Sequence, residues 1–182
     1  MTRDNTRMLE NYVMPKVLVL FDSGDQRADR LAELAADGAK KVRFTEVDIR
    51  VVGNESASNS ARRKRLESGD TVDQYDGVVV VGSDQEPAAA IDALLATHDQ
   101  NARSGFIDRV FAAVSDAGSS HRLTELRGIV VGPLSGSTNA ESTAGNIGER
   151  VAKVAEWVRH ALSHEHGHGH SHHDHAEHHH SR

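Results

Sequence analysis

The densest set of metal-binding side chains lies at the C-terminal end, where ten of the last nineteen residues are histidine. Imidazole nitrogen is a good ligand for Zn²⁺, Ni²⁺ and Cu²⁺. A flexible chain can assemble several overlapping sites from such residues, although ordering entropy and proton competition limit the affinity. The candidate ligands are His164, His166, His168, His170, His172, His173, His175, His178, His179 and His180.

The interrupted spacing of these histidines distinguishes the segment from a purification tag, which is usually an unbroken run. Gly, Ser, Ala and acidic residues separate them, and this favours a native tail. We predict that residues 163–182 are a disordered, metal-binding tail. Its imidazoles become protonated near pH 5, so the metal should be released there.

A second candidate site is the turn between the apolar run Lys16–Phe21 and an Ala/Leu-rich helix that extends from about Gly24 to Lys40 and is closed by Gly38. In open α/β sheets such a turn lies at the carboxyl end of a central strand, where the following helix N-terminus binds phosphate. The turn residues are Ser23, Gly24, Asp25, Gln26 and Arg27.

Two interpretations of this turn remain open. Arg27 and Arg30 favour an anion, whereas Asp22, Asp25 and Asp29 oppose one. Ser23 and Gln26 also match a capping box, in which two side chains satisfy the helix's first N–H groups. The same pattern recurs as Ser83-x-x-Glu86 and Thr138-x-x-Glu141, so these helices are alternatively capped by their own side chains.

The elements that position these turns alternate between apolar strands and helices, which predicts a parallel sheet covered on both faces. Strands are expected at 16–21, 43–51 (with Phe44 among its apolar positions), 75–82, 109–115 and 128–134. Helices are expected at 24–40, 87–97 and 139–162, and Trp157 falls beside the apolar stripe of the last one. Arg62–Arg65 is expected in a short, solvated helix, and only about 120–126 remains for the fourth crossover helix.

Composition limits the classes of function. The 182 residues carry a net charge of −6, no cysteine and no long apolar run. These features argue against nucleic-acid binding, disulfides and membrane insertion, and we expect a cytoplasmic protein. No Ser-His-Asp, Walker or GxGxxG pattern is present, and no catalytic side chain is proposed. We expect an N-terminal arm at 1–14, one domain at 15–162 and the tail.

Two sequence segments resemble a known family. Val17-Leu-Val-Leu-Phe-x-Ser23, together with Ala36-Asp-Gly-Ala-Lys40, and Tyr75-Asp-Gly-Val-Val-Val-Val-Gly82 are similar to the multimeric flavodoxin-type NAD(P)H:quinone oxidoreductases. The resemblance covers about 16–162. It implies a flavodoxin-like, doubly wound α/β fold with a five-stranded parallel sheet in the order 2-1-3-4-5. It also implies FMN as cofactor, a small-molecule redox substrate and a homo-oligomer.

The loops that would hold FMN differ from the family's pattern to different degrees. In the first loop Ser23 is kept, but Gln26 and Arg27 replace the family's Gly and His. The second loop lacks the family's aromatic residue and glycine, whereas the third keeps a small, polar composition. The implied contacts in these two loops are Ser83, Asp84, Gln85, Ser115, Asp116, Ala117 and Gly118.

Two functions are compatible with these observations. The first is an FMN-dependent oxidoreductase or electron carrier with altered flavin loops, in which the cofactor itself supplies the redox chemistry. The second is a cofactor-free flavodoxin-like domain whose tail binds, buffers or delivers a transition metal.

Overall fold

The computed structural model describes residues 14–22, 26–53, 63–67, 72–82, 88–100, 106–115, 121–132 and 139–165. Within these ranges a six-stranded parallel sheet has the order β3-β2-β1-β4-β5-β6. The strands are β1 (Lys16–Asp22), β2 (Glu46–Val52), β3 (Lys64–Arg65), β4 (Gly77–Val81), β5 (Val110–Val114) and β6 (Ile129–Val130). Five of them follow the predicted order, and β3 is an additional strand beyond β2.

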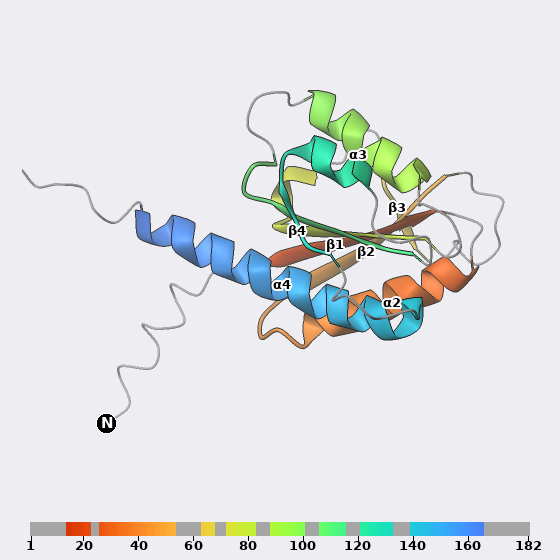
Figure 1. Cartoon of the computed structure of the whole chain (residues 1–182), viewed down its shortest axis with the longest axis horizontal. Coiled ribbons are helices and arrows are strands. Elements are labelled where there is room, and N and C mark those ends of the chain that lie inside the picture. Colours follow the sequence, from red (N-terminus) through yellow and green to blue (C-terminus); the bar gives the residue numbers. More distant parts are fainter. Residues whose placement is uncertain are drawn as a thin grey trace, which may run out of the picture.

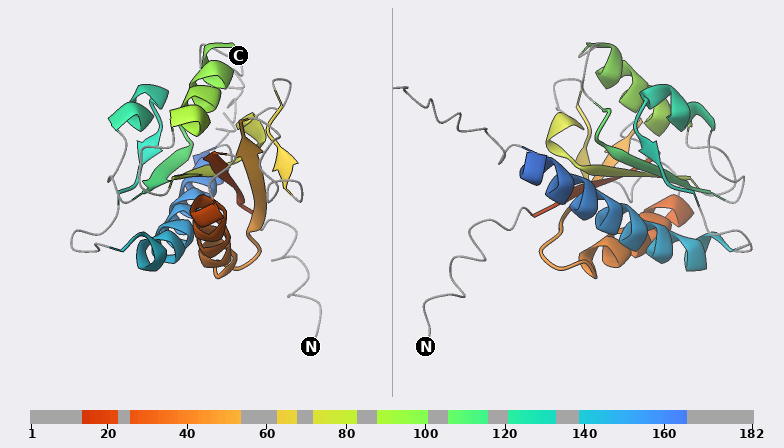
Figure 2. Two further views of the ribbon diagram at one scale, coloured as in Figure 1. Left: turned by 90° about the vertical axis from the view of Figure 1, so that its right-hand side faces the viewer. Right: turned by 60° about the vertical axis from the view of Figure 1, so that its left-hand side comes forward.

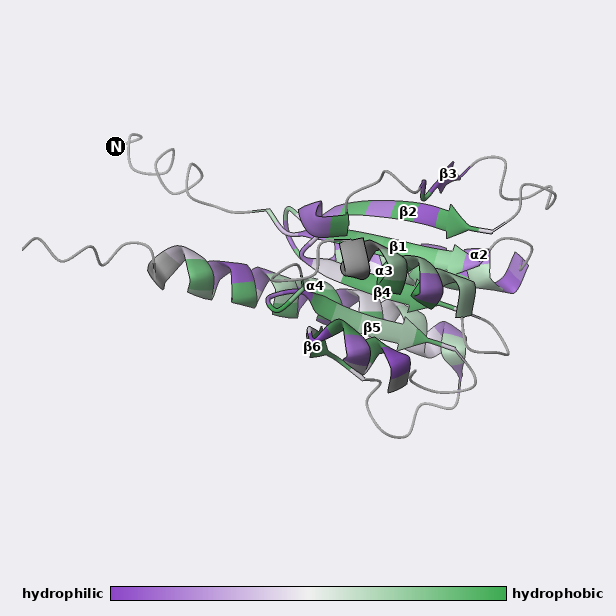
Figure 3. Ribbon diagram, turned by 90° about the horizontal axis from the view of Figure 1, so that it is seen from above, coloured by the Kyte–Doolittle hydropathy of each residue, from purple (hydrophilic) through white to green (hydrophobic). Residues whose placement is uncertain are grey.

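The three central strands form the core because almost every residue in them is apolar. Val17 and Val19 of β1 face one side of the sheet, whereas Leu18 and Leu20 face the other. All five residues of β4 and of β5 are buried, and the hydropathy colouring of Figure 3 shows both strands in green. Continuous apolar runs of this kind are typical of parallel strands buried on both faces.

Helices cover both faces of the sheet, as predicted. The α-helices α2 (Gln26–Lys40) and α4 (Ala140–Glu165) pack on one face. The other face is covered by α3 (Ala88–Gln100) and the 3₁₀-helix η3 (His121–Leu126), and a second 3₁₀-helix, η2 (Val72–Gln74), precedes β4. Figures 1 and 2 show this three-layer arrangement. The short η3 fits the predicted shortening of the fourth crossover. No helix in the described ranges is long and apolar enough to span a membrane.

Two predictions were wrong. One placed Arg62–Arg65 in a short helix, and the other placed Phe44 within the second strand. Residues Lys64–Arg65 form a strand rather than a helix, because their backbone pairs with Arg50 and Val51 of β2. Phe44 lies before β2 instead of within it. Its φ of 63° places it in a tight turn, and its side chain is exposed beside the guanidinium of Arg43.

We expected Gly38 to end α2. Instead, Gly38 lies inside the helix, where α2 meets α4. A Cβ on Gly38 would come within 1.9 Å of the carbonyl oxygen of Gly145, and one on Gly148 within 1.8 Å of that of Ala35. Glycine at these two positions therefore lets the helix backbones touch directly. The packed α2–α4 layer depends on this contact.

The two ends of α4 also differ from the prediction. Asn139 caps the helix, because its Oδ1 accepts the Glu141 N–H at 2.9 Å, whereas Thr138, the predicted cap, lies outside the described residues. At the other end the helix continues to Glu165, and its last turns project beyond the sheet (Figure 1). Trp157 is 70% exposed on this part, so it does not belong to the core.

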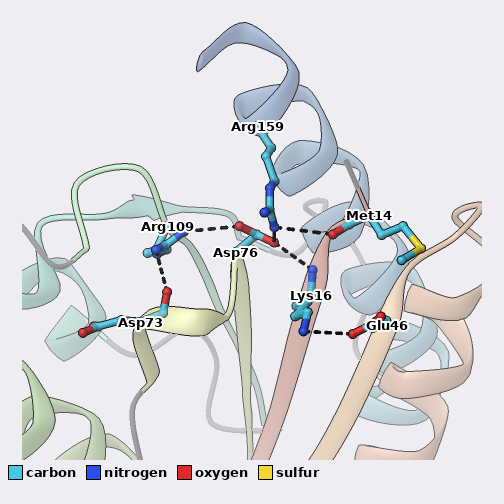
Figure 4. A network of polar contacts seen from close by, with 7 residues as sticks. All are labelled: Met14, Lys16, Glu46, Asp73, Asp76, Arg109 and Arg159. Carbon is cyan, nitrogen blue, oxygen red and sulfur yellow. Dashed lines mark hydrogen bonds and ion pairs between the residues drawn. The ribbon is translucent and has the colours of Figure 1, made fainter. Parts of the chain in front are cut away.

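A buried carboxylate joins the amino ends of the central strands to α4 (Figure 4). Asp76 is only 5% exposed. It accepts hydrogen bonds from the Lys16 backbone N–H at 2.8 Å and from the Arg109 and Arg159 guanidinium groups at 3.2 and 2.6 Å. The two arginines are themselves held by the carbonyl oxygens of Asp73 and Met14, respectively. One carboxylate thus connects β1, β4, the start of β5 and α4.

We expect Gly148→Ala to destabilise the fold by about 2 kcal/mol or more, because the methyl group would overlap the Ala35 carbonyl. Gly145→Ala is the matched control, since its Cβ would meet only the Leu34 oxygen at an ordinary 3.6 Å. Alanine favours helix, so this control should be neutral or stabilising. Urea denaturation measures the unfolding free energy of both variants. Equal destabilisation by the two substitutions would contradict the interpretation that the backbones of α2 and α4 touch at Gly148.

We expect Asp76→Ala to cost about 3–5 kcal/mol of unfolding free energy, because it leaves two arginines without their buried partner. Asp37→Ala removes an exposed carboxylate that pairs with Lys40 and should change stability by less than about 0.5 kcal/mol. The same denaturation experiment compares the two. A similar small effect for both substitutions would show that the Asp76 network contributes little.

Candidate functional site

The carboxyl ends of three central strands meet at one edge of the sheet. Phe21 of β1 pairs with Val81 of β4, which in turn pairs with Val114 of β5. The chain therefore leaves these strands at neighbouring positions toward residues 23–25, 83–87 and 116–120. The sheet also changes its direction of winding between β1 and β4, since β2 lies on one side of β1 and β4 on the other. Open α/β sheets bind ligands at such a switch point.

Three of the predicted flavin contacts lie in the described part of the chain. Gln26 and Arg27 form the exposed start of α2, and Ser115 directly follows β5 and is half-buried. They thus begin or end elements at the same edge of the sheet. The remaining contacts lie outside the described residues and stay predictions: Ser23, Gly24, Asp25, Ser83, Asp84, Gln85, Asp116, Ala117 and Gly118.

Asp22 interacts with the N-terminus of α3. Its Oδ1 accepts the backbone N–H of Ala90 at 2.7 Å, in the first turn of that helix. This bond satisfies one of the helix's early N–H groups and places the negative charge at the positive end of its dipole. It also ties the end of β1 to the helix that follows β4.

Asp29, in the first turn of α2, has a cationic partner. The Arg63 Nε lies 3.0 Å from its Oδ1, and the same guanidinium also binds Glu33. The arginine-rich segment that precedes β3 therefore contributes a bridge to α2. This pair could not be recognised from the sequence, because its members are 34 residues apart and no local pattern links them.

These contacts help to decide whether the residues at the carboxyl edge of the sheet could bind a phosphate group. The sequence suggested three carboxylates close to the turn, but Arg63 compensates the charge of Asp29, and Asp22 bonds to α3. The 15-residue helix α2 also presents its N-terminus there, with Arg27 exposed beside it. Helix N–H groups together with a guanidinium form a donor set that suits a phosphate. The described residues at this edge are therefore compatible with FMN.

A cavity of about 600 Å³ lies at the opposite, amino edge of the sheet. Ala155, Val158 and Leu162 of α4 form its apolar wall, and Asp108 and the Asp76 network contribute polar groups. Both of its arginines bind Asp76. No sequence pattern indicates this cavity, because its lining comes from η2, Asp76, residues 108–109 and the end of α4.

Tyr75 lies between η2 and β4 and is buried. It donates a hydrogen bond to Asp48 Oδ2 at 2.6 Å. Burial and the negative charge of Asp48 raise the pKa of Tyr75 to about 12, so its hydroxyl stays protonated at neutral pH. Its role in the described structure is to connect β4 with β2.

The predicted metal ligands lie almost entirely beyond the described ranges, which include only the backbone of His164, in the last turn of α4. Among the described residues, no group of three or more metal-ligating side chains comes together. The other nine predicted ligands, from His166 to His180, lie outside the described residues and stay predictions.

Comparisons with known proteins identify the fold. No protein-family model and no curated protein matches the sequence. A flavodoxin from the domain Archaea is structurally similar, with a TM-score of 0.50, 10% identity, and coverage of 78% of this chain and 99% of that one. A flavone reductase aligns with a TM-score of 0.49 and 17% identity over 80% of this chain and 65% of its own. A diflavin flavoprotein A3 from Nostoc sp. aligns at 0.46 and 17%, covering 84% and 99%. The chain has the flavodoxin-like fold.

Proposed function

We propose that this protein binds FMN at the carboxyl edge of its sheet and acts as an NAD(P)H:quinone-type oxidoreductase or an electron carrier. The observation that carries this proposal is the juxtaposition of the ends of β1, β4 and β5 beside the switch point of a flavodoxin-like sheet. The structurally similar proteins include flavodoxins, one of them bound to flavin mononucleotide.

In this proposal the chain binds and orients the cofactor. The start of α2, with Gln26 and Arg27, would hold the phosphate through backbone N–H groups and a cationic side chain. Ser115, with the residues that follow it, would contact the flavin from the β5 side. FMN supplies the hydride or electron transfer when it is bound, so no protein acid or base is required.

The composition of the loops suggests modest affinity. The segment after β4, Ser83–Pro87, contains no aromatic side chain to stack on the flavin ring. The turn after β1 has only one glycine, Gly24, to allow a close approach of the backbone. We therefore propose weak, reversible binding that could be lost during purification.

The test is a titration of the protein with FMN, followed by flavin absorbance and fluorescence. We expect quenched fluorescence and shifted bands at micromolar FMN. Arg27→Glu should weaken binding by about tenfold, because it reverses a charge beside the phosphate. Arg43→Glu is the matched control, since Arg43 is an equally exposed arginine in the turn before β2, at the opposite edge.

Two results would contradict this proposal. An unchanged flavin spectrum at high micromolar FMN would exclude the redox assignment. Equal weakening by both arginine substitutions would instead indicate general electrostatic attraction rather than a phosphate site at α2.

The tail supports a second candidate function, that of a protein that binds, buffers or delivers Zn²⁺, Ni²⁺ or Cu²⁺. Ten histidines follow Ser163 in the sequence, and the last described turn of α4, which ends at Glu165, lies at the amino edge of the sheet. That edge is opposite the proposed flavin site, because the Arg159–Asp76 contact places the end of α4 at the amino end of β4. Metal binding therefore does not require FMN.

Truncation after Ser163 should abolish the binding of several equivalents of Zn²⁺, measured by calorimetry at pH 7.5. For the full chain, binding should also be lost on acidification to pH 5, where tail imidazoles become cationic. Full metal binding by the truncated chain would contradict the tail proposal.

A further inference from the structure

The cavity at the amino edge of the sheet has a lining that neither the flavin proposal nor the metal proposal uses. Its volume of about 600 Å³ is of the size that holds small organic ligands. Ala155, Val158 and Leu162 of α4 form an apolar wall, and the guanidinium groups of Arg109 and Arg159 lie in the polar wall. Two walls of this kind suit a molecule with an apolar body and one charged end.

The apolar wall still has surface that a ligand can cover. Ala155, Val158 and Leu162 follow one another at intervals of three and four residues, so they lie on one face of α4. Ala155 and Val158 are buried, whereas Leu162 is 37% exposed. Covering an apolar side chain that water now contacts is favourable in proportion to the area removed from water.

The charges in the polar wall favour an anionic end on the ligand. Asp76 is shared by Arg109 and Arg159, so two positive charges meet one negative charge and this group carries a net charge of +1. Asp73 binds Arg109 through its backbone carbonyl oxygen, and Figure 4 shows its side-chain carboxylate directed away from both arginines. Asp108 is exposed, so water and salt screen its charge.

Arg159 has N–H donors left for such an anion. Its Nη1 donates to Asp76 Oδ2 at 2.6 Å and to the Met14 carbonyl oxygen at 3.4 Å. Within the described part of the chain, its Nε and Nη2 have no hydrogen-bond partner, and the side chain is 38% exposed. These two N–H groups lie on one edge of the planar guanidinium and match the two oxygens of a carboxylate. Because Asp76 already holds the guanidinium, less ordering is needed when a ligand binds.

We propose that the amino-edge cavity binds a small organic anion, a monocarboxylate with an apolar body. The carboxylate pairs with Nε and Nη2 of Arg159, and the body packs against Val158 and Leu162. This site uses no residue of the flavin proposal and no histidine of the tail. The FMN titration and the tail truncation therefore test those two proposals independently of this one.

The experiment titrates the full chain, labelled with ¹⁵N, with two matched probes and follows the backbone amide signals by NMR. The probes are 4-phenylbutyrate and 3-phenylpropylamine, which share a phenylpropyl body and differ in the sign of the charged end. We expect 4-phenylbutyrate to give saturable shifts at Arg109 and at Val158–Ser163. The amine should bind at least about tenfold more weakly, because its charge is repelled by the arginines.

Substitutions in α4 locate the binding. Leu162→Glu should raise the dissociation constant of 4-phenylbutyrate by about tenfold, because it removes apolar contact and places a like charge at the cavity. Ala161→Glu is the matched control, since Ala161 is also exposed but does not line the cavity, and it should change the constant by less than about twofold. Arg159→Lys keeps a cation beside Asp76 but loses the paired donors, so it should also weaken binding by about tenfold.

Three results would overturn the anion site. Binding of the amine as tightly as the carboxylate would show that the arginines do not select the ligand. Shifts that fail to saturate with 4-phenylbutyrate would show that the cavity takes no such molecule. Equal weakening by Leu162→Glu and Ala161→Glu would indicate general charge repulsion instead of contact in the cavity. Urea denaturation checks that Arg159→Lys is folded, and if it is not, the comparison of positions 161 and 162 still decides.

Discussion

The buried carboxylate of Asp76 is the interaction on which the arrangement of the domain depends. A charge with 5% exposure is unfavourable unless it is well bonded, and here one backbone N–H and two guanidinium groups bind it. These donors belong to β1, to the residue before β5 and to α4. The contact therefore aligns the starts of the central strands and fixes the helix across them. It requires charged residues at three distant points in the sequence, and this makes the arrangement specific.

Because this network lies at the amino edge, the opposite edge does not depend on it. The segments after β1, β4 and β5 can vary in sequence without disturbing the network. At that edge, Asp22 accepts the N–H of Ala90, and the N–H of Gly82 donates to the carbonyl oxygen of Val114. The seven residues of β1 span roughly 23 Å, which separates the two edges. The proposed flavin site is thus separated in space from the end of α4, which precedes the histidine tail.

The sequence predicted the central architecture well, because Val17–Phe21 and Val78–Val81 are continuous apolar runs that permit few alternatives. It could not predict β3, since Lys64–Arg65 is short and charged, and only its pairing with β2 makes it a strand. From the sequence alone, Gly38 looks like a residue that ends a helix. Its contact with Gly145 shows instead that it allows α2 to pack closely against α4. The Arg63–Asp29 pair and the amino-edge cavity likewise depend on long-range contacts. The sequence predicted which strand ends meet at the carboxyl edge and that a helix begins beside β1, but it could not show that Arg63 pairs with Asp29.

The two short outer strands have a consequence for how the protein behaves at high concentration. Exposed sheet edges invite strands of other molecules to add to them, and short or charged edge strands oppose this. The sheet ends on one side in Lys64–Arg65 and on the other in Ile129–Val130, each only two residues long. Neither offers a long, flat row of backbone groups for another chain to extend. At high protein concentration the sheets of neighbouring molecules should therefore resist fusing into fibrils.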